Sequence, residues 1–152
     1  MLYRVKQFIW AIKSLFQEVD NDYVNKLLDK REKRLFNKLK KSDKQHCIRV
    51  SKDAVILSKD KGLNAKRVAK VALLHDIGKA IDFEMEGSHV QIGADLARKY
   101  NEDEVVVNSI LSHHGDTEPT SIIASIVAIA DTISASRPGA RNDSSENYFQ
   151  RL

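Results

Sequence analysis

The chain has 152 residues, of which 42% are hydrophobic and 30% are charged. This length and composition suit one soluble globular domain with a sizeable core, and they argue against disorder and against two domains. The single cysteine, Cys47, excludes an internal disulfide and a cysteine-rich metal site, so we expect a reducing, cytoplasmic setting. No apolar stretch approaches the length of a membrane-spanning helix, and the basic N-terminal segment is not typical of a signal peptide.

Charge is distributed unevenly along the chain. Residues 1–74 hold 19 basic and 8 acidic residues, whereas residues 75–152 hold 6 basic and 13 acidic residues. A basic surface attracts phosphates, but charge runs are usually solvated helix faces, which is the interpretation we favour for Lys38, Lys40, Lys41 and Lys44. Acidic residues in the second half suit a site that binds cations.

Apolar residues recur at helical spacing along most of the chain, and strand signals are nearly absent. An amphipathic helix is predicted near residues 2–19, and we expect it to pack on the rest of the domain rather than lie on a membrane surface. Two short helices are predicted over residues 22–28 and 32–39. A longer helix follows and runs to about Ser58, with Ser42 or Asp43 as its N-cap.

The next helix is predicted from the N-cap Asn64 to its C-terminal stop at Gly78. His75 and Asp76 therefore fall in its last turn, at the end of an apolar run. In one interpretation both are buried polar residues that find hydrogen-bond partners. In the other they are ligands of one metal ion, which requires further ligands elsewhere in the chain.

Further helices are predicted over residues 89–100 and about 103–113, the first with Ser88 as its N-cap. Pro119 suits the first position of a final helix, because its missing N–H group costs nothing there. That helix is apolar on nearly all sides, so we expect it at the centre of the core. The predicted fold class is all-α, a helical bundle that forms a single domain.

More histidines and another aspartate lie at the ends of apolar segments or within them: His46, His89, His113, His114 and Asp131. Imidazole and carboxylate without thiolate suit iron, manganese, zinc or magnesium. Burying several such groups without partners would cost several kcal/mol each, so convergence of even four of them favours a metal site.

The order of these residues, carried by the stretches QHCIRV, HDIGK and AIADTIS, resembles the HD superfamily of metal-dependent phosphohydrolases. From about residue 69 to residue 152 the chain is similar to the HD domain of the ribonuclease Y family, in LLHDIGKAID, EGSHVQIG, HHGDTEPTSI and ADTISASRPGAR. Residues 1–65 are more similar to small stand-alone bacterial HD proteins. The resemblance implies N-terminal helices over residues 1–40 packed on an HD core over residues 41–152.

The family pattern implies that one metal ion is held by four residues: His46, His75, Asp76 and Asp131. His89 would then join His113 in completing a second site, with the aspartate of the HD pair bridging the two ions. Manganese or iron is expected, as one ion or two, with magnesium and zinc as alternatives. Two ions can clamp a phosphoryl oxygen and lower the pKa of a shared hydroxide that attacks phosphorus, which makes that aspartate catalytic.

Other residues have expected roles with an alternative beside each. Lys79 is expected to stabilise the negative charge that develops on the phosphate. The alternative is an ordinary lysine that the helix dipole stabilises at a helix C-terminus. His114 is a candidate proton donor to the leaving oxygen, a ligand in place of His113, or a surface histidine. Arg137 and Arg141 are candidates for binding an outer phosphate of the substrate, although solvated arginines are the default.

The resemblance implies a hydrolase of phosphoester or phosphoanhydride bonds, and an enzyme like ribonuclease Y would cut RNA internally. The membrane anchor, coiled coil and RNA-binding KH domain of that family are absent from this sequence, and Phe83 stands where its pattern has a histidine. A small-nucleotide hydrolase, acting on a dinucleoside polyphosphate or a signalling nucleotide, is therefore the alternative. A non-catalytic regulatory domain stabilised by metal is a third possible function. The sequence is also compatible with a homodimer.

Overall fold

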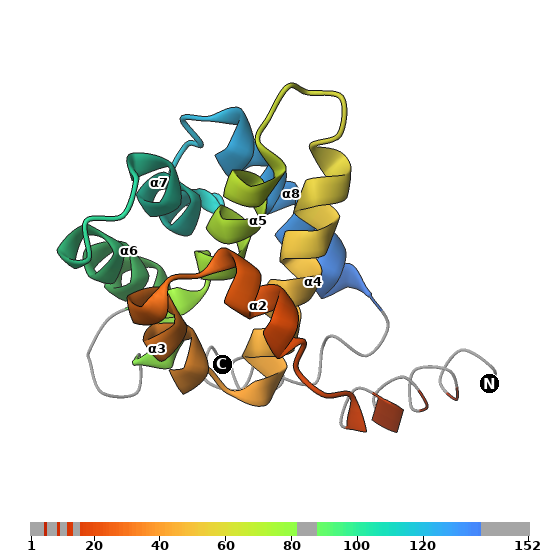
Figure 1. Cartoon of the computed structure of the whole chain (residues 1–152). Helices are drawn as coiled ribbons and strands as arrows, with labels where there is room; N and C mark the ends of the chain where they lie inside the picture. The colour runs from red at the N-terminus through yellow and green to blue at the C-terminus, as the bar shows by residue number, and fades with distance from the viewer. Residues whose placement is uncertain (1–4, 6–8, 10–11, 14–15, 82–87, 138–152) are drawn as a thin grey trace, which may run out of the picture. The chain divides into compact units, whose positions relative to one another are not determined.

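The computed structural model describes residues 5, 9, 12–13, 16–81 and 88–137. The chain divides into two compact units, residues 19–131 and residues 1–18 together with 132–152, and each is considered by itself. The described residues form helices and no strand, which confirms the all-α prediction (Figure 1). None of the helices they form is long and apolar enough to cross a membrane. The boundary expected at residue 40 stays a prediction.

Short polar side chains begin several of the helices. At the start of α3, the Asp29 side chain accepts from backbone N–H groups while the Glu32 side chain accepts from the N–H of Asp29, which forms a capping box. Asn64 and Ser88 cap the helices that follow them, as predicted from the sequence. In chain order the elements are α2 (Asn21–Leu27), α3 (Lys30–Lys38), α4 (Lys41–Leu57), α5 (Ala65–Leu74), the 3-10 helix η1 (Ile77–Ala80), α6 (His89–Lys99), α7 (Glu104–Ser112) and α8 (Ile122–Ser136).

One predicted helix start was wrong at α4. The N-cap of α4 is Lys40, which makes no side-chain capping bond, so neither Ser42 nor Asp43 caps this helix. The N–H of Lys44 already donates to the Lys40 carbonyl at 3.0 Å. The backbone therefore enters the helix before the polar side chains that were expected to begin it.

A second predicted start was wrong at α8, which begins at Ile122 and not at Pro119. The side chain of Asn108 donates to the Glu118 carbonyl at 3.1 Å and accepts from the N–H of Thr120 at 2.8 Å. These bonds hold the segment around the proline outside the helix. The hydroxyl of Ser121 accepts from the N–H of Ala124 instead.

The expectation that α8 lies at the centre of the core was also wrong. Ile123 and Val127 are buried, whereas Ile122 is 60% exposed and Ile129 is 52% exposed. Helix α8 therefore buries one face only. In residues 1–18, the described members of the predicted apolar stripe are exposed, namely Val5, Ile9, Ile12 and Phe16, and the packing of that stripe on the domain stays a prediction.

Helices α4 and α5 lie side by side, as Figure 1 shows, and carry much of the core. The hydroxyl of Tyr23 donates to Ser51 Oγ, which donates to the Ala69 carbonyl, both at 2.8 Å, so α2 is tied to α4 and α5. Burial of each large apolar side chain contributes about 1.5–3 kcal/mol. Fully buried members of this core are Val50, Ala54, Val68, Val71, Leu73, Val106, Val107 and Ile110.

Candidate metal centre

Polar side chains interrupt the core where several helix ends converge. Helix α5 ends at Leu74, so His75 is its C-cap and Asp76 precedes η1, whereas the sequence had placed both in the last turn. His113 is likewise the C-cap of α7. At these positions the side chains meet residues from α4, α6 and α8.

Two buried histidines repeat one arrangement. Nδ1 of His75 lies 2.7 Å from the Ala72 carbonyl, and Nδ1 of His113 lies 2.7 Å from the Ile110 carbonyl. A carbonyl oxygen only accepts, so each Nδ1 carries a proton, and in the neutral ring each Nε2 presents a lone pair. Both Nε2 atoms are buried without a hydrogen-bond partner, and so is Oδ1 of Asp76. Buried lone pairs that face one another suit a bound cation.

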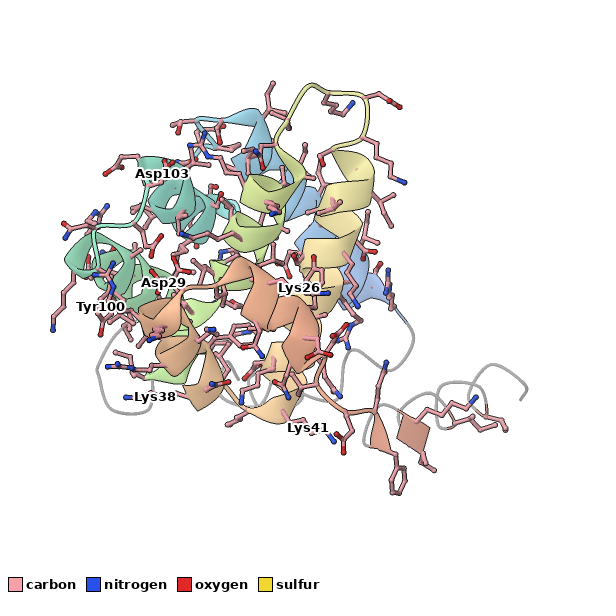
Figure 2. All side chains as sticks on the ribbon, viewed as in Figure 1. Lys26, Asp29, Lys38, Lys41, Tyr100 and Asp103 are labelled. Carbon is pink, nitrogen blue, oxygen red and sulfur yellow. The ribbon has the colours of Figure 1, made fainter. Side chains whose placement is uncertain are left out.

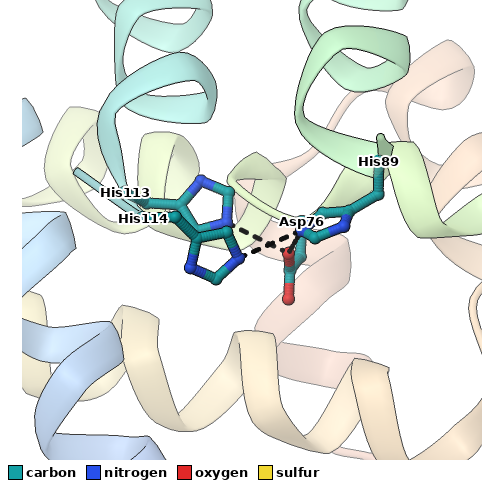
Figure 3. Close-up of side chains that lie close together, drawn as sticks. All are labelled: Asp76, His89, His113 and His114. Carbon is teal, nitrogen blue, oxygen red and sulfur yellow. Dashed lines mark hydrogen bonds and ion pairs between the residues drawn. The ribbon is translucent and has the colours of Figure 1, made fainter. Parts of the chain in front are cut away.

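Asp76 lies between two sets of imidazoles. Its Oδ2 is 3.8 Å from His46 Nε2 and 3.6 Å from His75 Nε2. Its Oδ1 is 3.4 Å from Nε2 of both His89 and His113. Figure 3 shows this carboxylate between the His89 ring and the His113–His114 pair. Because each oxygen faces a different set, the carboxylate could be shared by two cations.

The donor atoms form two groups, and within each group all atoms lie within 4.8 Å of one another. The first is His46, His75 and Asp131, and the second is Asp76, His89, His113 and His114. The structure thus brings together all six residues that the sequence suggested as ligands, although that role stays a prediction. Cys47 is fully buried and belongs to neither group of the described donors.

His114 is the member of the second group that sequence reasoning did not place there. It had been considered as a ligand only in place of His113, yet its Nε2 lies 3.2 Å from Nε2 of His89. Successive residues on a regular helix diverge by about 100°, which argues against a shared target. Both histidines lie just after Ser112, where α7 has ended. The sequence signal that could have placed His114 in this group is a pair of histidines immediately after a helix C-terminus.

A close contact between backbones brings Asp76 to the start of α6. A Cβ atom added to Gly78 would lie 1.8 Å from the carbonyl oxygen of His89 and 2.8 Å from the backbone nitrogen of Gly93. No side chain fits there, so glycine is required for packing and does not serve as the predicted stop of α5. This contact sets the distance between the Asp76 carboxylate and the His89 ring.

The two aspartates are ionised. Burial raises the pKa of Asp76, but the neighbouring histidines and Lys79 lower it by more, so that it lies well below its ordinary value. Burial also raises the pKa of Asp131, and its interactions with His46 and His75 outweigh burial and lower it. Both carboxylates therefore keep their charge at neutral pH, which is the form that binds cations.

His89 and His114, two histidines of the second group, are neutral at the same pH. Burial lowers the pKa of His89 to about 4, although the Asp76 charge opposes the shift. Burial and the nearby His113 lower the pKa of His114. Neutral imidazole is the form of histidine that binds a metal.

Three residues had been expected to bind substrate phosphate. The ammonium of Lys79 lies 2.8 Å from Oδ2 of Asp76, so in this structure it neutralises that carboxylate. Burial lowers the pKa of Lys79, but Asp76 raises it above its ordinary value, which keeps the ammonium charged. Arg137 follows α8 directly and belongs to the other unit, and Arg141 lies outside the described residues. Their phosphate-binding roles stay predictions.

Comparison with known proteins places this site in a family. The family model for the HD domain matches residues 44–136, which is more than half of the chain and includes every residue of both donor groups. No solved structure matches the chain.

Curated relatives named ribonuclease Y are similar over the same part of the molecule. The identity is 59% over 107 residues in Listeria welshimeri, 58% over 108 residues in Bacillus pumilus and 57% over 108 residues in Bacillus subtilis. These matches cover 70%, 71% and 71% of the chain but 21% of each relative, so the chain spans about a fifth of their length. The resemblance seen in the sequence is confirmed, and the chain belongs to the HD domain family of metal-dependent hydrolases that act on phosphoester bonds.

Proposed function

We propose that the chain is a metal-dependent phosphodiesterase that cleaves RNA. The observation that carries the metal centre is the set of three buried atoms without hydrogen-bond partners, Nε2 of His75, Nε2 of His113 and Oδ1 of Asp76. Membership of the HD family supports the hydrolysis of a phosphoester. The choice of RNA is supported by the similarity of about 70% of the chain to ribonuclease Y.

Two divalent ions fit the donors better than one, because Asp76 directs a different oxygen to each set of imidazoles. The first ion would be held by His46, His75, Asp76 and Asp131, and the second by Asp76, His89, His113 and His114. Imidazole and carboxylate donors suit manganese or iron. When bound, such ions supply positive charge at the phosphate and lower the pKa of water toward neutrality.

The chain's own groups prepare the site for this chemistry. The Ala72 and Ile110 carbonyls fix the ring orientation of His75 and His113, so these imidazoles need no reorganisation. Lys79 adds a fixed positive charge beside Asp76, which attracts a phosphate. At neutral pH His114 is not in the imidazolium form that donates a proton readily, so we assign it as a ligand and not as the proton donor to the leaving oxygen.

The test compares Asp76→Asn with a matched control, Asp95→Asn, which makes the same change at an exposed position of α6. Purified proteins are assayed for bound metal, then for hydrolysis of bis(p-nitrophenyl) phosphate and of a 5′-labelled single-stranded RNA with Mn²⁺. Asp76→Asn should lower both rates by at least about a hundredfold, because it removes a shared ligand rather than a residue that supports one. Asp95→Asn should retain the wild-type rates.

Product analysis separates the remaining functions. Internal cuts that leave a 5′ phosphate support the RNA proposal. Hydrolysis of a dinucleoside polyphosphate with the RNA intact would replace RNA by a small nucleotide. Bound metal without hydrolysis of any substrate would indicate a regulatory domain, and equal rates for wild type and Asp76→Asn would reject the proposed active site.

A further inference from the structure

A strongly basic surface lies where α3 passes into α4. We call it the basic corner, and it consists of Arg34, Lys38, Lys40, Lys41 and Lys44. The first four are exposed and Lys44 is half-buried. Figure 2 shows Lys38 and Lys41 at the same end of these two helices. Residues 33–44 hold six basic residues and one acidic residue, Asp43.

The basic corner and the candidate metal centre share helix α4. Helix α4 carries Lys41 and Lys44 in its first turns together with His46, whose Nε2 lies 2.9 Å from Asp131 Oδ1. Helix α3 packs against η1, which carries Lys79. Asp43 of α4 is close enough to Lys79 to act on its charge together with Asp76. Both helices of the corner therefore adjoin elements that hold the two donor groups.

The spacing along α4 limits which ligands can contact both the basic corner and the metal centre. Residues of the corner on α4 precede His46 by two to five positions, which is about 3–8 Å along a helix. When one phosphate of a ligand is held at the metal centre, the basic corner can contact other phosphates of the same molecule. A ligand that occupies both places carries several phosphates, as a nucleic-acid strand does.

We infer that the basic corner binds backbone phosphates of a single nucleic-acid strand, on one side of the bond that is cut at the metal centre. This inference rests on the proposed function. Phe36, the aromatic residue of residues 33–44, is buried, so this described segment offers no ring on which a base can stack. Contacts to phosphate alone give binding that depends steeply on salt and little on sequence.

The corner is also largely separate from the part of the chain that defines the family. The family model begins at residue 44, so four of the five residues of the corner lie before it. Sequence reasoning had treated the lysines of this surface as a solvated face. Their position beside η1 and His46 is the feature that favours a bound polyanion.

The test reverses three charges of the corner in Arg34→Glu/Lys38→Glu/Lys40→Glu. The matched control, Lys59→Glu/Lys61→Glu/Lys66→Glu, makes an equal change of charge at exposed lysines beyond the other end of α4 (Figure 1). Binding of a fluorescent single-stranded RNA is followed by anisotropy over a range of salt. Hydrolysis of bis(p-nitrophenyl) phosphate with Mn²⁺ is measured on the same proteins, because this small diester does not reach the corner.

The corner variant should bind RNA at least about tenfold more weakly at low salt, and its salt slope should fall by about 2, since each lost phosphate contact on a single strand removes about 0.7. Its hydrolysis of the small diester should equal that of wild type. The control should lose much less affinity.

Equal losses of affinity in the two variants would overturn the inference, because they would report net charge alone. Poly-glutamate that displaces RNA as well as unlabelled RNA does would also overturn it. Failure of the wild type to hydrolyse the small diester would instead reject the proposed function, while the RNA binding data would still test the corner.

Discussion

Two clusters of buried charge lie within residues 19–131, and they are neutralised in different ways. In the first, which we call the Glu32 cluster, Oε1 of Glu32 lies 2.5 Å from Lys70 Nζ, and Oε2 accepts from the Asp29 N–H at 2.7 Å. Glu102 completes it, with Oε2 3.3 Å from the same ammonium. The Lys70 ammonium thus neutralises Oε1, which has no hydrogen-bond partner, and a backbone N–H satisfies Oε2, in a residue that is only 5% exposed.

The metal centre gathers more charge and satisfies less of it. Lys79 neutralises Oδ2 of Asp76, but Oδ1 faces the imidazoles of His89 and His113 without a hydrogen bond. Burying groups in this way is costly unless a further partner binds. The contrast distinguishes a structural ion cluster, which holds its own counter-ion, from a site arranged for a ligand.

The largest effect on stability should come from breaking the backbone contact on which the metal centre depends. In Gly78→Ala the new Cβ would lie 1.8 Å from the His89 carbonyl oxygen, so η1 and α6 must separate. We expect a loss of about 3 kcal/mol and a melting temperature lowered by roughly 6–12 °C. Thermal unfolding followed by circular dichroism measures this change.

A control substitution separates this contact from the general cost of replacing a glycine. Gly62 has φ of 67° and no atom within 4 Å of an added Cβ. Gly62→Ala should therefore cost only the strain of a left-handed residue, about 1–2 kcal/mol. Equal losses in the two variants would show that the approach of η1 to α6 is not tight.

A slightly smaller change in stability is expected when cations bind at the metal centre. Addition of Mn²⁺ to chelator-treated protein, at a concentration about a hundredfold above the dissociation constant, should stabilise the fold by about 2.7 kcal/mol. The melting temperature should rise by roughly 5–11 °C. Differential scanning calorimetry with and without the ion measures the shift.

The Glu32 cluster provides the control for that experiment. Lys70→Met removes its cation, so this variant should melt lower than wild type in both conditions and yet show the same increase with Mn²⁺. Asp76→Asn should show a much smaller increase. A shift that disappears in Lys70→Met and persists in Asp76→Asn would reverse our assignment of the two clusters.

Sequence reasoning found what local chemistry specifies. Asn64 and Ser88 were recognised as N-caps because capping is settled within one turn of chain. The ligand candidates were found because metal binding restricts residue type wherever the chain places it. Pro119 was misplaced because the bonds that hold its segment come from Asn108, on the preceding helix.

Features that depend on distant contacts were beyond the sequence. The pairing of Glu32 with Lys70 joins α3 to α5, and no spacing rule within one helix predicts it. The same is true of the approach of Gly78 to the His89 carbonyl. A one-sided α8 was missed because an apolar composition does not reveal which face has a partner.

The smallest predicted effect concerns the opposite responses of the two clusters to pH in metal-free protein. Burial and a hydrogen bond with Glu32 raise the pKa of Glu102, although Lys70 opposes the shift. Its contribution to the free energy of unfolding is therefore present below the ordinary pKa of 4.5 and is lost as pH rises through the raised value. Glu102→Gln does not titrate, so the stability of wild type relative to this variant should fall between pH 4.5 and neutrality.

Asp131 should behave in the opposite sense, because its interactions with His46 and His75 outweigh burial and hold its pKa below the ordinary 3.8. Its contribution is present above that value and is lost as pH falls through the lowered one. The stability of wild type relative to Asp131→Asn should therefore fall on acidification. Urea unfolding across this range measures both differences, and profiles with the same slope would mean that the two clusters do not differ in how the fold satisfies their charge.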